Sequence, residues 1–249
     1  MSRIKLTVAY DGTNYCGWQR QPGGVVTVEG RLNEALSELT KENIEVIGAS
    51  RTDSGVHAMG NIAVFDTQSR IPAEKFMYAL NVRLPEDIRV MKSEQTEDDF
   101  HPRHVDCNKT YVYRICNATV CPPTKRLYAH HEYVALDVKK MQEASKELIG
   151  EHNFEAFCSA GSQAKDTVRT IYSISVDKDG DEITIRVNGN GFLYNMVRII
   201  AGTLIEVGKG RKTGEDIKKA LETGQRNFAG PTAPARGLTL CEINYENNV

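Results

Sequence analysis

The stretch IEVIGASRTDSGVHA, residues 44–58, is the most informative part of this 249-residue chain. A β-branched run before Gly48 predicts a strand, and the small residues that follow allow the backbone to turn. Asp53 comes next, with Arg51 two positions before it and Gly55 two positions after it. This grouping indicates a reactive carboxylate on a loop at a strand end rather than a packed core.

Two other interpretations of Asp53 remain open at this point. Asp-Ser-Gly sequences often form turns in which the aspartate bonds its own backbone. Asp-Ser-Gly is also the signature of aspartic proteases, and a homodimer would then have to supply the second carboxylate. Arg51 and Thr52 stand where such a site has apolar residues, and a permanent cation opposes a proton shared between two acids. The protease interpretation is therefore disfavoured.

Composition predicts a globular protein without a membrane span. Hydrophobic residues make up 40% and charged residues 26%, and no apolar run approaches the roughly 20 residues that cross a bilayer. The N-terminus leads directly into strand-like sequence rather than a signal peptide, so we expect a cytoplasmic protein. The net charge of −2 argues mildly against nucleic-acid binding, although phosphate contacts need only a local basic patch.

The cysteines and histidines do not predict a metal site. Six cysteines are scattered without CxxC spacing, which favours free or buried thiols in a cytosolic chain. The pairs His101 with His104 and Cys116 with Cys121 lack a second pair at the spacing that zinc requires. We expect no metal.

Hydrophobic periodicity predicts an α+β fold with a mixed, largely antiparallel sheet flanked by helices. Strands are expected over residues 4–10, 44–47, 62–65, 88–91, 110–116, 170–176, 182–187 and 238–245. Helices are expected over residues 28–39, 72–80, 137–149, 192–207 and 213–221. The sequence Asp177–Gly180 predicts a hairpin between two of the strands. Polar sequence near residues 100–108 suggests two subdomains, 1–104 and 105–249.

Tyr111 lies in the predicted strand KTYVYRI, residues 109–115. The two-residue period of a strand places Tyr111 and Tyr113 on one face. One explanation is that both rings pack the sheet and have no other role. Beside a reactive aspartate, an aromatic face can instead hold a nucleobase pulled out of its stack, at about 1–3 kcal/mol per base.

Arg198 lies in GNGFLYNMVRIIAG, residues 189–202, which predicts a helix that is apolar on nearly all sides. An arginine among apolar residues is costly unless an acid pairs with it. A structural ion pair and a side chain that snorkels to solvent are two explanations. The third is that Arg198 pairs with Asp53.

Together these motifs identify a family resemblance that covers nearly the whole chain. The quoted segments join further blocks in one order: YDGT at 10–13, GWQRQ at 17–21, FHPR at 100–103, NF at 153–154, RTI at 169–171 and GL at 237–238. The chain resembles the tRNA pseudouridine synthase A family. It departs from the family pattern at Asn195, where a histidine is expected, at Glu29, where a glutamine is usual, and at Pro102, where a small residue is usual.

The resemblance implies the pseudouridine synthase fold, with two similar-sized α/β halves and the active-site cleft between them. The N-terminal half would carry the catalytic aspartate loop, and the C-terminal half the tyrosine strand and the arginine helix. It also implies isomerisation of uridine to pseudouridine at positions 38, 39 and 40 of the tRNA anticodon stem-loop, without a cofactor. A homodimer with tRNA lying across both subunits is expected. A catalytically silent RNA-binding protein of the same fold is the alternative.

The resemblance also assigns roles to individual residues. Asp53 would start glycosidic-bond cleavage, as nucleophile or by removing a sugar proton, with Arg198 as its ion-pair partner. Tyr111 would stack on the flipped uracil, with removal of the C5 proton as a second role. Arg51 would contact RNA or shape the loop. For the weaker candidates a phosphate contact competes with a surface ion pair: Arg20, His57, Arg103 and Arg169.

Overall fold

The computed structural model describes residues 1–162 and 164–245, which form two compact units. The first unit comprises Met1–Cys107 together with the chain from Leu240, and the second comprises Asn108–Thr239. The predicted subdomains 1–104 and 105–249 stay a prediction. The units differ from them at the final strand, which from Leu240 onward belongs to the first unit.

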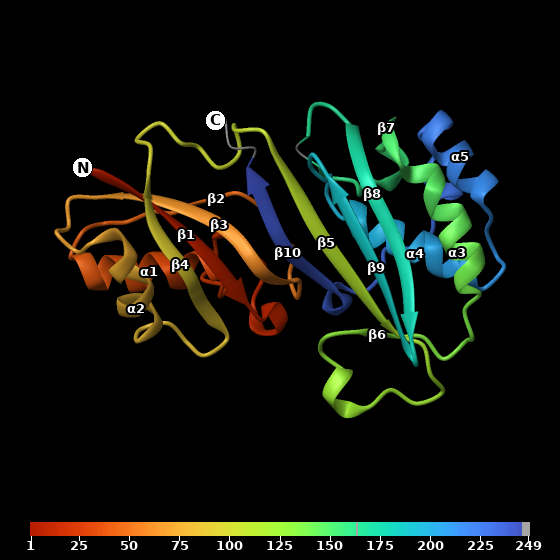
Figure 1. Ribbon diagram of the computed structural model, residues 1–249, viewed down its shortest axis with the longest axis horizontal. Coiled ribbons are helices and arrows are strands. Elements are labelled where there is room, and N and C mark those ends of the chain that lie inside the picture. Colours follow the sequence, from red (N-terminus) through yellow and green to blue (C-terminus); the bar gives the residue numbers. More distant parts are fainter. Residues whose placement is uncertain (163, 246–249) are drawn as a thin grey trace. The chain divides into compact units, whose positions relative to one another are not determined.

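The first unit is a sheet with strand order β4-β1-β3-β10. Antiparallel ladders join β1 to β3 and to β4, and a two-residue strand, β2, pairs with β3. Figure 1 shows α1 and α2 beside this sheet. The bounds are β1 Ser2–Tyr10, α1 Val28–Thr40, β2 Ile47–Gly48, β3 His57–Thr67, α2 Phe76–Asn81, β4 Ile88–Thr96 and β10 Leu238–Tyr245.

Alternation along β1 explains why this sheet packs on one face. Leu6 and Val8 are fully buried, whereas the residues between them are partly exposed. Phe65 of β3 meets Phe76 of α2 edge to face, with ring centroids 5.2 Å apart. Burial of each such side chain contributes about 1.5–3 kcal/mol to the stability of the fold. The core therefore fixes β1 and β3, and residues of both strands bond the Asp53 loop.

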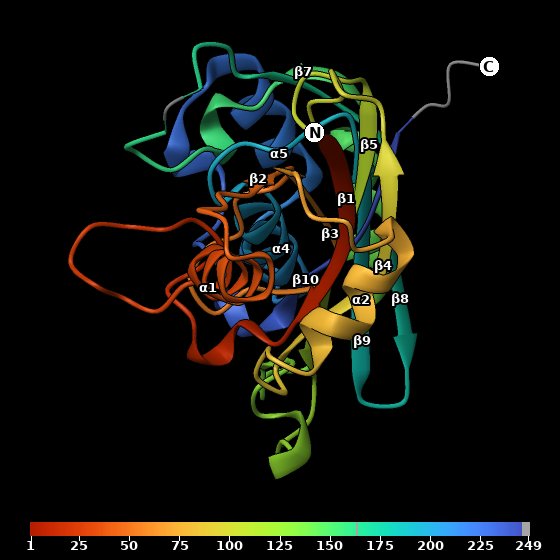
Figure 2. The ribbon, with the colours of Figure 1, turned by 90° about the vertical axis from the view of Figure 1, so that its left-hand side faces the viewer.

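The second unit carries a sheet of order β5-β9-β8-β7 with antiparallel ladders, and β6 pairs parallel to β5. The helix α3 contacts α4, α5 and β8, and Figure 2 shows α4 and α5 on one side of β5, β8 and β9. The bounds are β5 Cys107–Cys116, β6 His130–His131, α3 Val138–Ser145, β7 Gly150–Asn153, β8 Val168–Asp179, β9 Glu182–Gly189, α4 Met196–Gly208 and α5 Gly214–Thr223.

The α+β prediction with a largely antiparallel sheet is confirmed, and so is the hairpin, which turns at residues 180–181 between β8 and β9. Several elements differ in extent from the prediction: the helix expected over 72–80 begins as an α-helix only at Phe76, the helix expected over 137–149 ends at Ser145, and the strand expected over 62–65 covers His57–Thr67. The strand expected over 44–47 is reduced to β2, because the Ile44 and Val46 N–H groups bond the side chains of Ser37 and Asn33 on α1.

The helix expected from residue 192 begins only at Met196. Asn195 is in the left-handed region, with φ 61°, so the backbone before it is not helical. The helix itself is buried on nearly all sides, as predicted. Among the described residues, no helix has both the length and the apolar character that a bilayer span requires.

Candidate active site

The loop that carries Asp53 joins β2 to β3 and is tied to β3 by hydrogen bonds. The Ala49 N–H donates to the Ile62 carbonyl at 2.7 Å. The fully buried Asn61 side chain bonds both backbone groups of Ser50, at 3.3 Å to the N–H and 3.0 Å to the carbonyl. Because a buried amide bonds the backbone at both of its ends, the first half of the loop has little freedom to move.

The backbone on either side of Asp53 is held by β1 and by the segment after it. The Tyr10 and Thr52 hydroxyls bond at 2.7 Å, and the Trp18 N–H donates to the Thr52 carbonyl at 3.0 Å. Gly17 has φ +84°, and a Cβ there would lie 2.6 Å from the Thr52 oxygen. Only glycine fits this approach. Asp53 itself is half-buried.

His57 lies behind the loop and faces inward, with 5% of its surface exposed. Its Nδ1 lies 3.1 Å from the Gly12 N–H and also 3.1 Å from an Asp11 carboxylate oxygen. These contacts need different protonation states. The Gly12 N–H donates to Nδ1, so this ring nitrogen acts as an acceptor toward the Gly12 backbone. The phosphate contact predicted for His57 stays a prediction.

Three arginines from the sequence analysis lie in the first unit, and two of them, Arg51 and Arg103, lie close enough for their charges to repel each other. Arg103 donates from Nε to the Gly48 carbonyl at 2.6 Å. Although Arg103 is exposed overall, partial burial at that contact lowers its pKa, the positive charge of Arg51 lowers it further, and Glu29 opposes the shift. Glu29 also accepts a hydrogen bond from the Arg20 backbone N–H at 2.6 Å. Arg51 and Arg103 therefore bring positive charge to the Asp53 loop, partly balanced by Glu29, whereas the Arg20 guanidinium lies 4.0 Å from the Glu45 carboxylate.

In the second unit, Tyr111 is on β5 opposite Val187 of β9 and is 8% exposed. The Phe192 ring meets it edge to face, with centroids 5.2 Å apart at 83°. Phe192 lies just before α4 and packs over Gly189. The sequence analysis did not single out Phe192, although it lies in the quoted segment 189–202.

Arg198 projects from the first turn of α4 and is held at two points. Its Nε donates to the Ala233 carbonyl at 2.8 Å, and its Nη1 donates to the Asn195 Oδ1 at 2.7 Å. The Ala233 N–H returns a bond to the Arg198 carbonyl at 3.1 Å. The segment around Ala233 packs directly on α4, because a Cβ at Gly202 would lie only 1.8 Å from the Pro231 oxygen.

Arg169, at the start of β8, bonds the backbone carbonyls of Asp166 and Val168. A Cβ at Gly191 would lie 3.7 Å from its Nε, so Arg169 lies beside the segment that carries Phe192. The second unit thus contains Tyr111, Arg198 and Arg169, and the first unit contains Asp53 and the other basic candidates. The predicted pairing of Asp53 with Arg198 joins residues of different units and stays a prediction.

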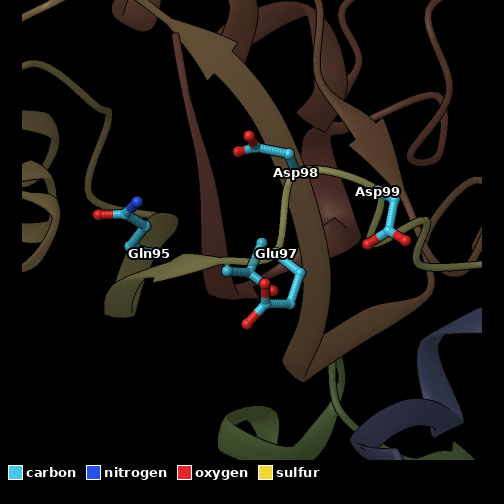
Figure 3. Close-up of a pocket in the computed structure, with 5 residues that line it drawn as sticks. Gln95, Glu97, Asp98 and Asp99 are labelled. Atoms are coloured by element: carbon cyan, nitrogen blue, oxygen red, sulfur yellow. The ribbon is translucent and has the colours of Figure 1, made fainter.

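An acidic pocket elsewhere in the first unit does not suit an anionic ligand. It has a volume of about 530 Å³, is lined by Gln95–Asp99 and contains three carboxylates (Figure 3). These carboxylates repel phosphate. Among the described residues, no three His, Cys, Asp or Glu side chains are grouped as a metal site.

The first unit thus places an aspartate on a rigid loop with arginines beside it, and arginine side chains suit contacts with phosphate groups. The family profile for tRNA pseudouridine synthase matches residues 6–104 and 144–246. The chain is 51% identical over 243 residues to tRNA pseudouridine synthase A 2 of Clostridium tetani, covering 97% of this chain and 98% of that protein.

Two further relatives match over the same extent. Identity is 46% over 245 residues to tRNA pseudouridine synthase A 2 of Clostridium perfringens and to tRNA pseudouridine synthase A of Brevibacillus brevis, each covering 98% of this chain and 100% of the relative. The chain therefore belongs to the tRNA pseudouridine synthase family. This confirms the family resemblance and its fold class.

Proposed function

We propose that this protein isomerises uridine to pseudouridine in the anticodon stem-loop of tRNA, at positions 38, 39 and 40. The full-length match to pseudouridine synthases carries this proposal. The rigid Asp53 loop supports it, since a single fixed carboxylate suits a reaction that needs no group donor and no redox change. No cofactor is required, because the N1–C1′ bond breaks, the base rotates and C5 bonds to C1′ within one nucleotide.

Asp53 starts the cleavage, either by attack of its carboxylate on C1′ or by removal of a sugar proton. Both routes need the ionised carboxylate, and cover by a nucleobase disfavours that form. Arg198 offsets this by pairing with Asp53. The Ala233 carbonyl and the Asn195 amide support that role, because they fix the direction of the guanidinium. A pre-oriented cation loses less freedom when it pairs.

Tyr111 stacks on the everted uracil. Its neighbour Phe192 supports this role by fixing the tilt of the ring. Stacking on an aromatic ring stabilises an unstacked base by about 1–3 kcal/mol, which offsets much of the few kcal/mol that base flipping costs. An ordinary tyrosine is neutral at pH 7, so stacking does not require the hydroxyl, whereas removal of the C5 proton would.

The basic side chains hold the RNA backbone. Arg51, Arg103 and Arg20 contact phosphates beside the Asp53 loop, and Arg169 does so in the second unit. His57, which is buried, contributes by holding the loop against the Gly12 backbone. The protein acts as a cytoplasmic homodimer with tRNA across both subunits.

The test is to incubate the protein with an unmodified tRNA transcript that has uridine at positions 38, 39 and 40. Carbodiimide treatment followed by primer extension then maps pseudouridine as reverse-transcriptase stops. Stops at these positions, absent from a transcript with cytidine there, are expected. Tight tRNA binding without any stop would instead identify a silent RNA-binding protein.

A further inference from the structure

Asn195 begins α4 in an unusual way. A residue in the N-cap position normally has an extended backbone, and its side chain accepts a hydrogen bond from one of the first helical N–H groups. Asn195 is instead left-handed, with φ 61° and ψ 7°, and its side chain makes no cap bond. Asparagine tolerates this backbone better than most residues do. The amide is therefore free of the usual capping role toward the first backbone N–H groups of α4.

Both ends of the Asn195 amide are used. Oδ1 accepts from the Arg198 Nη1 at 2.7 Å, and Nδ2 donates to the Ser159 Oγ at 3.0 Å. The orientation of the amide is fixed by chemistry, because a guanidinium only donates and so must face the oxygen. The amide thus joins Ser159 to Arg198 with one acceptor and one donor.

Ser159 is itself a fixed point. Its backbone N–H donates to the Tyr194 carbonyl at 3.1 Å, so this segment is bonded to residues 194 and 195 in succession. It follows a short 3-10 turn, Glu155–Phe157, in which Ala156 and Phe157 are fully buried. One of the hydrogen bonds that hold the Arg198 guanidinium therefore belongs to a chain of contacts that ends in the core of the second unit.

We propose that Asn195 is a positioning residue for catalysis, which holds Arg198 in its working orientation through a neutral side chain with one acceptor and one donor. This inference rests on the proposed function, in which Arg198 pairs with Asp53. Replacements of Asn195 are therefore expected to keep activity only if they also offer Arg198 an acceptor and Ser159 a donor. Alanine offers neither group. Neutral histidine offers one ring nitrogen as acceptor and the other as donor, but protonated histidine offers two donors and cannot accept from Arg198.

The Asn195→His variant therefore makes the positioning dependent on pH. A histidine titrates near pH 6.5, and the neighbouring guanidinium lowers its pKa further, so we compare pH 7.5 with pH 5.0. The charge of Arg198 also acts on Tyr113, and Tyr113 is in turn affected by the charge of Arg236. Tyr113 stays neutral in this range, because burial raises its pKa. Arginine stays charged throughout.

The measurement is the single-turnover rate of pseudouridine formation with saturating enzyme, expressed at each pH as a ratio to wild type, together with the Kd for tRNA. Asn195→Ala is expected to be about 10-fold slower or more at both pH values, with unchanged Kd, since a hydrogen bond to a charged group is lost. Asn195→His is expected within about 3-fold of wild type at pH 7.5 and near the alanine variant at pH 5.0. The exposed Asn227, replaced by histidine, is the control and should give a flat ratio.

A wild-type rate for Asn195→Ala, or an Asn195→His variant that is as slow as Asn195→Ala at pH 7.5, overturns the inference. Arg198→Ala, measured in the same assay, distinguishes this failure from that of the proposed function. If Arg198→Ala is slow while both Asn195 variants match wild type, only the positioning role is wrong. If Arg198→Ala is as fast as wild type, the use of Arg198 in the proposed function is wrong, and this inference fails with it.

Discussion

Replacing Gly17 with alanine is expected to slow catalysis by about 100-fold while leaving the fold intact. The added Cβ would lie 2.6 Å from the Thr52 carbonyl oxygen and 3.2 Å from the Asp53 carbonyl carbon, both backbone atoms. Ordinary contact begins at 3.4 Å, so the Thr52 carbonyl must move by about 0.8 Å (3.4 minus 2.6). Asp53, the next residue, moves with it. A misplacement of about 1 Å at a reacting group costs about 100-fold in rate.

The left-handed backbone adds a separate cost. Alanine at φ +84° destabilises the protein by about 1–2 kcal/mol relative to glycine. Gly210, after α4, isolates this cost, because it has φ +73° and an added methyl group there would meet no neighbour within 4 Å. Both variants should therefore lose about 1–2 kcal/mol of stability from the backbone, but only Gly17→Ala should also displace the loop.

The assay is the single-turnover rate with saturating enzyme, combined with urea unfolding of both variants. Gly210→Ala is expected to keep the wild-type rate. A Gly17→Ala enzyme that also keeps it would refute the claim that this contact fixes Asp53. A Gly210→Ala enzyme that is equally slow would instead attribute the loss to backbone strain.

Three further changes have defined outcomes. Tyr111→Phe should keep most activity and Tyr111→Ala lose it if stacking suffices, whereas equal loss in single-turnover assays would implicate the hydroxyl. Arg51→Gln should reduce the slope of log Kd for tRNA against log salt by about 1, since one phosphate contact is lost; an unchanged slope would exclude that contact. Burial alone would raise the pKa of Glu132. Its hydrogen bonds, of which the one from Lys209 at 2.6 Å has the largest effect, instead hold the pKa below the ordinary 4.5. Glu132→Gln should therefore lower the free energy of unfolding at pH 7 by about 1–3 kcal/mol, since Lys209 keeps its ion pair with Glu206. The difference from wild type in urea unfolding should shrink as pH falls through that lowered pKa, and a difference that is constant with pH would contradict the pairing.

The strands and helices with a regular pattern of apolar residues were predictable, because the pattern within each element shows which of its sides is buried. The alternation in β1 and the helical spacing in α1 each follow from which side faces a core. The strand prediction for the segment 44–47 was wrong, since Ile44 and Val46 are buried but their N–H groups bond α1 side chains. Periodicity records burial and not the hydrogen-bond partner, so it predicts the wrong backbone there.

The site shows the same limit. Asp53, Tyr111 and Arg198 were singled out through the family resemblance, because on local sequence alone a turn aspartate, a sheet-packing tyrosine and a structural ion pair explain them as well. Nothing in the local sequence indicates that His57 is buried. Nor does it indicate that Asn195 bonds Ser159, which is 36 residues away. Such contacts between distant segments depend on how the chain folds, and no local pattern encodes them.

Pseudouridine formation by Asp53→Asn tests the central claim most directly. The amide keeps the shape of the side chain and removes its negative charge, so tRNA should still bind and no isomer should appear in a single turnover mapped by carbodiimide-dependent stops. A variant that forms pseudouridine at the wild-type rate would contradict the assignment of Asp53 as the group that starts the reaction.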